Sequence, residues 1–209
     1  MSAPIPGNAI VHLIDDDEDV RRALAFALGT AGLAVRVHES ADRFLDALPG
    51  LQPGCIVSDV RMPGMDGLQL QRKLQELGVK MPIIIMTGHA DVPLAVQAMK
   101  AGAIDFIEKP FDDERLLAAI AVAMQTCDTD GRTSTELQKI LARLELLSPR
   151  ERQVLEGLLA GHPNKTIAYD LGLSPRTVEV HRANVMTKMG AGSLPDLVRM
   201  GITAKLLSQ

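Results

Sequence analysis

Aromatic side chains are scarce in this sequence. They make up 2% of its 209 residues, with no tryptophan and one tyrosine. A buried core must therefore consist mainly of Leu, Val, Ile, Ala and Met, which is feasible because hydrophobic residues reach 46%. The two cysteines, Cys55 and Cys127, form neither a metal-ligand spacing nor a disulfide framework. No apolar run approaches the roughly 20 residues of a membrane span, and no basic stretch followed by an apolar one begins the chain. We therefore expect a soluble cytoplasmic protein that does not bind membranes.

Charge is distributed unevenly along the chain. Residues 1–135 carry 12 basic and 19 acidic side chains, whereas residues 136–209 carry 10 basic and 7 acidic ones. The length fits one domain of ordinary size followed by a smaller one. An acidic first part and a mildly basic second part indicate different partners, with a polyanion as the candidate for the second.

Five short apolar segments alternate with helical patterns between residues 10 and 125. The segments predict strands at 10–14, 33–37, 54–59, 82–86 and 104–107. Helices are predicted at about 20–28, from a cap at Ser40 to Leu48, and at about 68–77, 92–101 and 111–125. Apolar strands that alternate with helices are typical of a parallel sheet covered on both faces. The fold class predicted for this part is a five-stranded, doubly wound α/β sheet.

Polar residues follow four of these strands. Asp15 and Asp16 follow the first, Asp59 ends the third, Thr87 follows the fourth and Lys109 follows the fifth. The carboxyl ends of parallel strands meet at one edge of the sheet, where ligands bind in open α/β folds. Clustered carboxylates repel one another, and a hard divalent cation such as Mg²⁺ relieves that repulsion. A carboxylate beside such an ion can attack a phosphoryl group to form an aspartyl phosphate, which Lys109 and the Thr87 hydroxyl would stabilise.

The second part of the chain contains several helix-start signals. A polar segment at 126–135 predicts a linker, and apolar residues between Leu137 and Leu144 predict a short amphipathic helix. This helix either packs on one of its own domains, which we favour, or pairs two domains or two chains. Ser148 opens a capping box, Asn164 is expected to cap a helix over 165–171, and Ser174 and Ser193 open two more helices. The turn Gly172-Leu173-Ser174 between the second and third helices is typical of a helix-turn-helix.

The third of these helices has two distinct faces. Val178, Val185 and Met189 form an inward face, with His181 beside them. The opposite face carries small, polar and charged groups that suit a major groove roughly 12 Å wide. These candidate base contacts are Arg176, Thr177, Glu179, Val180, Ala183 and Asn184. The candidate phosphate contacts are Lys165, Thr166, Arg182 and Lys188. Charge alone leaves open a four-helix protein-interaction module.

Residues 10–125 resemble a response-regulator receiver domain, and residues 148–207 resemble a LuxR-type DNA-binding domain. The segments from Thr87 to Val96 and from Met99 to Phe111 are similar to the FixJ group of response regulators. The resemblance implies strand order 2-1-3-4-5, Asp59 as phosphoryl acceptor, Asp15 and Asp16 as the acid pair, and the Arg61 carbonyl as a further metal ligand. It also implies a cis peptide between Lys109 and Pro110, and a switch in which Phe106 couples to Thr87. The face made by the fourth helix and fifth strand would then carry a receiver dimer.

We therefore predict a receiver at 1–125, a linker with a helix at 126–147, and a four-helix, LuxR-type helix-turn-helix domain at 148–209. The function expected is that of a phosphorylation-activated transcriptional regulator, with Mg²⁺ or Mn²⁺ as cofactor. Its expected partners are a sensor histidine kinase, double-stranded promoter DNA, RNA polymerase and a second copy of the chain. It is not expected to be an enzyme, beyond its own phosphorylation and dephosphorylation. The alternative is a phosphorylation-gated interaction module that does not bind DNA, which salt-dependent binding to duplex DNA would distinguish.

Overall fold

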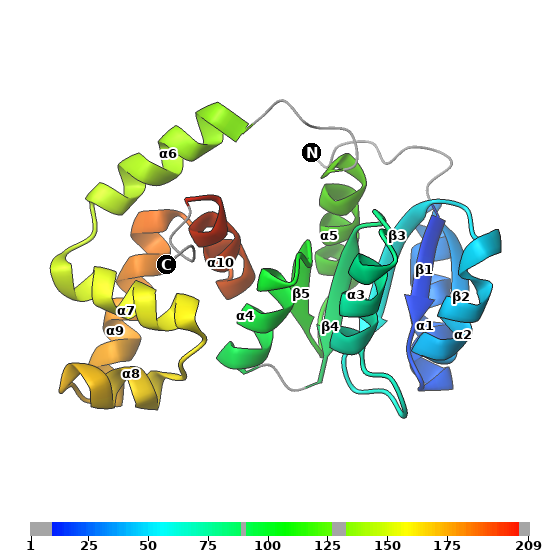
Figure 1. Cartoon of the computed structure of the whole chain (residues 1–209), viewed down its shortest axis with the longest axis horizontal. Helices are drawn as coiled ribbons and strands as arrows, with labels where there is room; N and C mark the ends of the chain where they lie inside the picture. The colour runs from blue at the N-terminus through cyan, green and yellow to red at the C-terminus, as the bar shows by residue number, and fades with distance from the viewer. Residues whose placement is uncertain (1–9, 89–90, 127–132, 205–209) are drawn as a thin grey trace. The chain divides into compact units, whose positions relative to one another are not determined.

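The computed structural model describes residues 10–88, 91–126 and 133–204. They form an α/β unit and a helical unit (Figure 1). Five parallel strands make one sheet in the predicted order β2-β1-β3-β4-β5. The strands are β1 (Ile10–Ile14), β2 (Ala34–His38), β3 (Gly54–Asp59), β4 (Ile83–Thr87) and β5 (Asp105–Glu108). Within the described part of the chain, no helix has the length and apolar character needed to cross a membrane.

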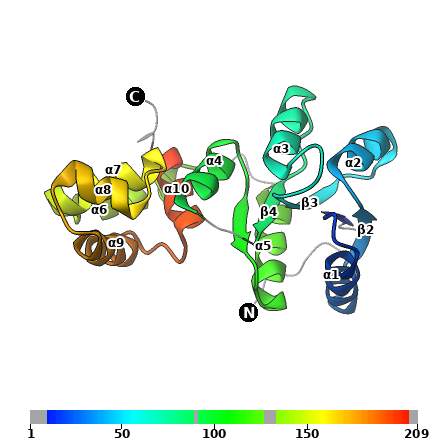
Figure 2. The same ribbon diagram turned by 90° about the horizontal axis from the view of Figure 1, so that it is seen from below.

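Helices cover both faces of this sheet. Figure 2 shows α1 and α5 on one side of the strands and α2 and α3 on the other. The helices of this part of the chain are α1 (Glu18–Thr30), α2 (Ala41–Ala47), the 3₁₀ turn η1 (Leu48–Gly50), α3 (Gly67–Glu76), α4 (Val92–Lys100) and α5 (Asp113–Thr126). Strands buried on both sides read as continuous apolar runs, which is why β3 and β4 were visible in the sequence.

The core on the α1 and α5 side is almost entirely aliphatic. Leu13, Val57 and Ile84 of the sheet pack with Leu28 of α1 and Ile120 of α5. Aliphatic side chains thus fill the volume that aromatic rings occupy in many cores, as the composition predicts. The observed boundaries differ slightly from the predicted ones. Helix α1 continues through Gly29 and ends at Thr30, and β2 begins one residue later than predicted.

A separate aromatic cluster occupies the other face of the sheet at β1 and β2. The rings of His12 and His38 lie with their centroids 5.8 Å apart, and both contact the fully buried ring of Phe44. Burial lowers the pKa of His38 to about 4, with smaller contributions from His12 and Arg36. His12 Nε2 lies 2.9 Å from the Gln52 carbonyl oxygen. Both imidazoles are therefore neutral at neutral pH.

The helical unit contains helices α6 to α10 together with α4, which packs against α10 and α7. Their bounds are α6 (Thr133–Glu145), α7 (Pro149–Ala160), α8 (Asn164–Leu171), α9 (Pro175–Met189) and α10 (Leu194–Thr203). The predicted capping box at Ser148 is present, and Ser174 and Ser193 cap their helices through the backbone N–H three residues later. The predicted inward residues Val178, Val185 and Met189 are buried.

Two details of the predicted helical part are wrong. Asn164 does not cap α8: Pro163 is the N-cap residue, Asn164 is the first helical residue, and its buried Oδ1 has no hydrogen-bond partner. The predicted linker at 126–135 is also too long, because α6 begins at Thr133; residues 127–132 lie outside the described ranges. Helix α6 packs against α9, as expected for a helix that packs within its own domain.

Candidate functional site

Parallel pairing brings the polar strand ends to one edge of the sheet. Asp59 pairs with Met86 in the β3–β4 register, and Thr87 pairs with Glu108 in the β4–β5 register. The backbone N–H of Lys109 continues this ladder and donates to the Thr87 carbonyl at 2.7 Å. Asp15 follows β1, whose last residue, Ile14, pairs with Ser58. The sheet therefore places Asp15, Asp59, Thr87 and Lys109 at the carboxyl ends of neighbouring strands.

Lys109 joins the two buried carboxylates. Its Nζ donates to Asp15 Oδ2 at 2.7 Å and to Asp59 Oδ1 at 2.6 Å. Asp15 and Asp59 are 1% and 7% exposed, whereas the Lys109 side chain is 24% exposed. Because one ammonium group contacts both carboxylates, their oxygens lie within a few ångströms of each other. Lys109 is thus placed to neutralise negative charge at Asp59.

Burial and ion pairing act against each other at this site. Burial raises the pKa of Asp59, and the hydrogen bond and charge of Lys109 offset only part of that rise. Burial lowers the pKa of Lys109, but its bonds to Asp15 and Asp59 outweigh burial, so the net pKa is raised. Lys109 therefore stays protonated, and its positive charge is available beside Asp59.

Backbone groups orient both carboxylates. The Arg61 N–H donates to Asp59 Oδ2 at 2.6 Å, and the Asp17 N–H donates to Asp15 Oδ1 at 3.0 Å. Arg21 Nη1 donates to the Asp15 carbonyl at 2.8 Å. Sequence reasoning missed Arg21; its place two residues after the acidic run was the only signal available.

Gly67 allows the chain to return close to Asp59. A Cβ atom at Gly67 would lie 2.2 Å from the Asp59 carbonyl oxygen, which is far inside contact distance. The Gly67 N–H instead donates to the Val60 carbonyl at 2.9 Å, and Asp66 caps α3 through a capping box with Gln69. A residue without a side chain is therefore required where α3 begins beside the acceptor strand.

The other predicted residues of this site lie around the carboxylate pair. Thr87 is fully buried and Phe106 is nearly so, whereas Asp16 and Arg61 are exposed. The peptide between Lys109 and Pro110 is cis, as the resemblance implied. Among the described residues, no three acidic, histidine or cysteine side chains converge as metal ligands. The structure thus brings together two of the three predicted carboxylates and leaves Asp16 beside them, open to solvent.

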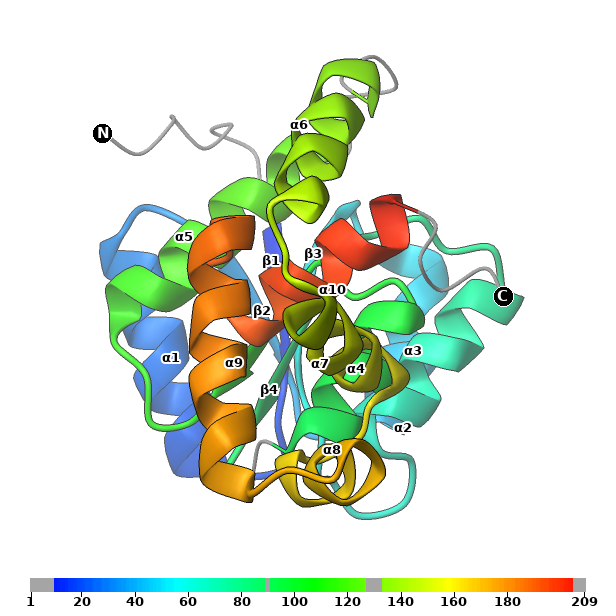
Figure 3. The ribbon, with the colours of Figure 1, turned by 90° about the vertical axis from the view of Figure 1, so that its left-hand side faces the viewer.

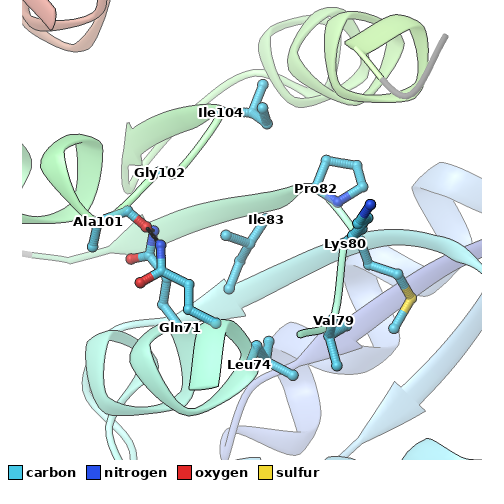
Figure 4. Close-up of a pocket in the computed structure, with 11 residues that line it drawn as sticks. Gln71, Leu74, Val79, Lys80, Pro82, Ile83, Ala101, Gly102 and Ile104 are labelled. Atoms are coloured by element: carbon cyan, nitrogen blue, oxygen red, sulfur yellow. Dashed lines mark hydrogen bonds between the residues drawn. The ribbon is translucent and has the colours of Figure 1, made fainter. Parts of the chain in front are cut away.

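A surface pocket of the α/β unit lies away from this site. It has a volume of about 240 Å³ and lies where β4 begins, whereas Asp59 and Thr87 lie where their strands end. Figure 4 shows Gln71 of α3 facing Ala101 in the wall of the pocket. The side-chain amides of Gln71 and Gln75 each donate a hydrogen bond to the Ala101 carbonyl at 2.6 Å. None of the residues that line the pocket was predicted to be functional.

The helical unit presents a helix-turn-helix. Helix α8 ends at Leu171 and is capped by Gly172, which has a φ of 65°. Helix α9 begins after Ser174, whose Oγ accepts the Thr177 N–H at 3.1 Å. Of the predicted DNA-contact residues, the exposed ones are Lys165, Thr166, Arg176, Glu179, Val180, Ala183 and Asn184. Thr177, Arg182 and Lys188 are half-buried. Sequence reasoning did not select Tyr169, which is 88% exposed on α8.

Comparisons with known proteins match both units. Residues 11–121 match the response regulator receiver domain family, and residues 145–201 match the luxR family of bacterial regulatory proteins. The transcriptional regulatory protein FixJ of Azorhizobium caulinodans is 57% identical over 200 residues, which cover 96% of this chain and 95% of that protein. FixJ of Rhizobium meliloti is 54% identical, with 92% and 94% of the two chains covered. The chain belongs to the FixJ family of response regulators.

Solved structures of the FixJ family agree with this assignment. Full-length FixJ from B. japonicum aligns with a TM-score of 0.56 and 53% identity, covering 95% of this chain and 98% of that one. The structure titled FixJ-N aligns with a TM-score of 0.54 and 50% identity over 56% of this chain and 94% of its own. As a FixJ-type response regulator, the protein is a phosphorylation-activated transcriptional regulator with a receiver domain and a LuxR-type DNA-binding domain.

One predicted DNA contact of this regulator is engaged inside its helical unit. Lys188 Nζ donates to Glu151 Oε2 at 2.7 Å, and the Glu151 side chain is 5% exposed. Glu151 also closes the capping box of α7 by accepting the Ser148 N–H at 2.8 Å. The hydrogen bond from Lys188, followed by that from Ser148, lowers the pKa of Glu151 to about 2. The geometry therefore ties Lys188 to α7, and sequence spacing alone did not indicate this pairing.

Proposed function

We propose that Asp59 is the residue of this response regulator that accepts the phosphoryl group. The observation that carries the proposal is the contact of Lys109 with both Asp59 and Asp15 at hydrogen-bond distance. In the reaction, an oxygen of Asp59 attacks the phosphorus of a phosphohistidine on a sensor kinase. The P–N bond breaks, the imidazole leaves with its electron pair, and an aspartyl phosphate remains. Lys109 would move from the carboxylate to the new phosphoryl oxygens.

The donor set of the site fits a hard divalent cation. Carboxylate and carbonyl oxygens are the ligands that Mg²⁺ and Mn²⁺ accept. We propose that Asp15, Asp16, Asp59 and the Arg61 carbonyl hold this ion. Two of these carboxylates already converge on Lys109, and the exposed Asp16 follows Asp15 directly in the chain. When bound, the ion would neutralise charge on the phosphoryl oxygens.

Thr87 and Phe106 are the proposed switch residues. Both are buried and lie on neighbouring strands, with Thr87 paired to Glu108, two residues beyond Phe106. Phosphorylation adds about two negative charges and strong acceptor oxygens at the end of β3. The Thr87 hydroxyl would hydrogen-bond a phosphoryl oxygen, and Phe106 would follow its movement. The face that α4 and β5 provide would then pair with a second copy of the chain.

The proposed output is binding to promoter DNA through α9. The base contacts proposed are Arg176, Thr177, Glu179, Val180, Ala183 and Asn184, and the phosphate contacts are Lys165, Thr166 and Arg182. Glu179 can accept a hydrogen bond from the N4 amino group of cytosine. A dimer would place two recognition helices about one DNA turn apart. RNA polymerase would be the downstream partner, and the regulator would act in the cytoplasm where promoter DNA is found.

The proposed domain limits are 1–125 for the receiver, 126–147 for the connecting segment and 148–209 for the DNA-binding domain. Because α6 packs against α9, the connecting helix would behave as part of the DNA-binding domain. The receiver would catalyse only its own phosphorylation and the hydrolysis of its aspartyl phosphate.

The test combines molar mass with DNA binding. Wild type and Asp59→Asn are incubated with Mg²⁺ and a small phosphodonor, then studied by light scattering and by titration with duplex DNA at several salt concentrations. We expect the wild type alone to double in mass and to bind DNA more tightly. An Asp59→Asn protein that still takes up one phosphoryl group would refute the assignment of the acceptor. Unchanged mass in fully phosphorylated wild type would refute the dimerisation step.

A further inference from the structure

The C-terminal end of recognition helix α9 is held by a side chain from another helix. Arg143 of α6 donates from Nη1 to the Met189 carbonyl at 2.9 Å. Met189 is the last residue of α9, and the final carbonyls of a helix lack donors within the helix. A cation at this end also interacts favourably with the helix dipole. Arg143 thus provides both a hydrogen bond and a charge where α9 needs them.

The cap of α9 is shaped to receive this guanidinium. Gly190 has a φ of 63°, a conformation that favours glycine, and donates its N–H back to the Thr187 carbonyl. A Cβ atom at Gly190 would lie 3.2 Å from both Cζ and Nη1 of Arg143, and 3.3 Å from Nη2. Since all three atoms are nearly equidistant from that point, the guanidinium lies flat over the glycine. The close fit explains why a side chain at position 190 would disturb the contact.

Helix α6 is itself fixed within the helical unit. Ile140 and Leu144 of α6 are buried, as is Leu147 just after the helix, and Arg152 Nη2 of α7 donates to the Leu144 carbonyl at 2.8 Å. The end of α6 lies beside the C-terminal end of α9 (Figure 3). The match to the luxR family begins at residue 145, so Arg143 precedes the matched segment. The contact therefore joins a residue outside the matched segment to one inside it.

We propose that Arg143 is a positioning residue for sequence-specific DNA binding. It fixes the end of α9 relative to α6 and α7, and thereby the angle at which the recognition helix enters the major groove. This role rests on the proposed function, in which α9 reads the bases. Specific contacts need side chains placed to within a fraction of an ångström, whereas non-specific attraction to phosphates tolerates small rotations. Loss of Arg143 is therefore expected to weaken specific binding about tenfold and to leave non-specific binding unchanged.

The experiment uses the full-length chain, phosphorylated with a small phosphodonor. The specific probe is a duplex selected from a random-sequence pool by the wild-type protein, and the non-specific probe is mixed-sequence duplex DNA. Arg143→Met removes the contact, and Arg143→Lys restores the charge and one donor. Lys139→Met is the matched control, because Lys139 is an exposed cation one turn earlier on α6. Circular dichroism checks that each variant is folded at the assay temperature.

We expect Arg143→Met to lose about tenfold in affinity for the selected duplex and to keep its affinity for the mixed-sequence duplex. Arg143→Lys should recover part of the lost affinity, and Lys139→Met should bind the selected duplex as tightly as wild type. Wild-type specific affinity in a folded Arg143→Met protein would overturn it. A loss on both probes, with the salt dependence reduced by about one phosphate contact, would also overturn it and make Arg143 a DNA contact. Failure of the wild type to select any duplex would instead overturn the proposed function of α9, and the positioning role with it.

Discussion

Replacing Lys188 by Met tests whether this residue acts within the helical unit or on DNA. Its ammonium lies 2.7 Å from Glu151, a carboxylate whose side chain is 5% exposed. The pKa of Glu151 falls from 4.5 to about 2 in the folded protein. A depressed carboxylate pKa contributes stability that is present above pH 4.5 and is lost as the pH falls toward 2. A shift of this size corresponds to roughly 3 kcal/mol.

Solvent reduces the part of that free energy that belongs to Lys188. The Lys188 side chain is 38% exposed, and Ser148 provides the next hydrogen bond to Glu151. We therefore expect Lys188→Met to lower the free energy of unfolding of the helical unit by about 1 to 2 kcal/mol at neutral pH. The pKa of Glu151 should rise, and most of the stability difference between wild type and variant should vanish in strong acid.

Three measurements check this prediction. Carboxyl NMR follows the titration of Glu151, amide hydrogen exchange at the buried Val154 and Val185 follows the stability of the unit, and DNA titration follows the salt dependence. Lys165→Met serves as the comparison, since loss of a phosphate contact should lower the salt slope by about one. If Lys188→Met lowers that slope and leaves Glu151 and amide exchange unchanged, the ion-pair argument is wrong.

Three further predictions concern the receiver. Gly67→Ala should lower the free energy of unfolding by more than about 2 kcal/mol in urea titrations, because its Cβ would lie 2.2 Å from the Asp59 carbonyl; a midpoint like that of wild type would contradict the close approach. Because the pKa of His38 is lowered to about 4, the wild-type receiver should lose roughly 3 kcal/mol between pH 6.5 and 4 as the unfolded state takes up the proton first. The rate at which a thiol reagent labels the buried Cys55, measured in a Cys127→Ser background, reports this loss of stability. The substitution His38→Gln should remove most of the loss. Lys109→Met should slow phosphorylation by a small phosphodonor about 100-fold, measured by intact mass; a rate equal to wild type would exclude Lys109 from the reaction.

Much of the α/β unit could be predicted because its central strands, β1, β3 and β4, are buried on both faces. Such strands give unbroken apolar runs, as in Ile83 to Met86, and the residue after each run marks the edge of the sheet. The strand order came from the family resemblance, since periodicity cannot decide which strands are neighbours. Short polar motifs likewise placed Asp59 and Lys109 at one edge without giving their distance.

The features that escaped prediction depend on contacts between distant residues. Lys188 and Glu151 are 37 positions apart, so only packing of α7 against α9 shows that they pair. Likewise, only the packing of α6 against α9 shows that Arg143 contacts Met189. Asn164 has the residue type of a helix cap, but the backbone of Pro163 already adopts the extended conformation that a cap requires. The residue type thus correctly predicts that a helix begins here, but it places the cap one residue too late.

The scarcity of aromatic residues makes this regulator a spectroscopically quiet molecule. It has no tryptophan, and its single tyrosine, Tyr169, lies on α8 with 88% of its surface exposed. Tyrosine emission from the unlabelled chain therefore originates from one known position, one helical turn after Lys165 on the helix that precedes the recognition helix. A tryptophan introduced at Phe106 would add a second, spectrally separable signal from the receiver. One native and one engineered fluorophore would then let phosphorylation and DNA binding be timed in the same sample.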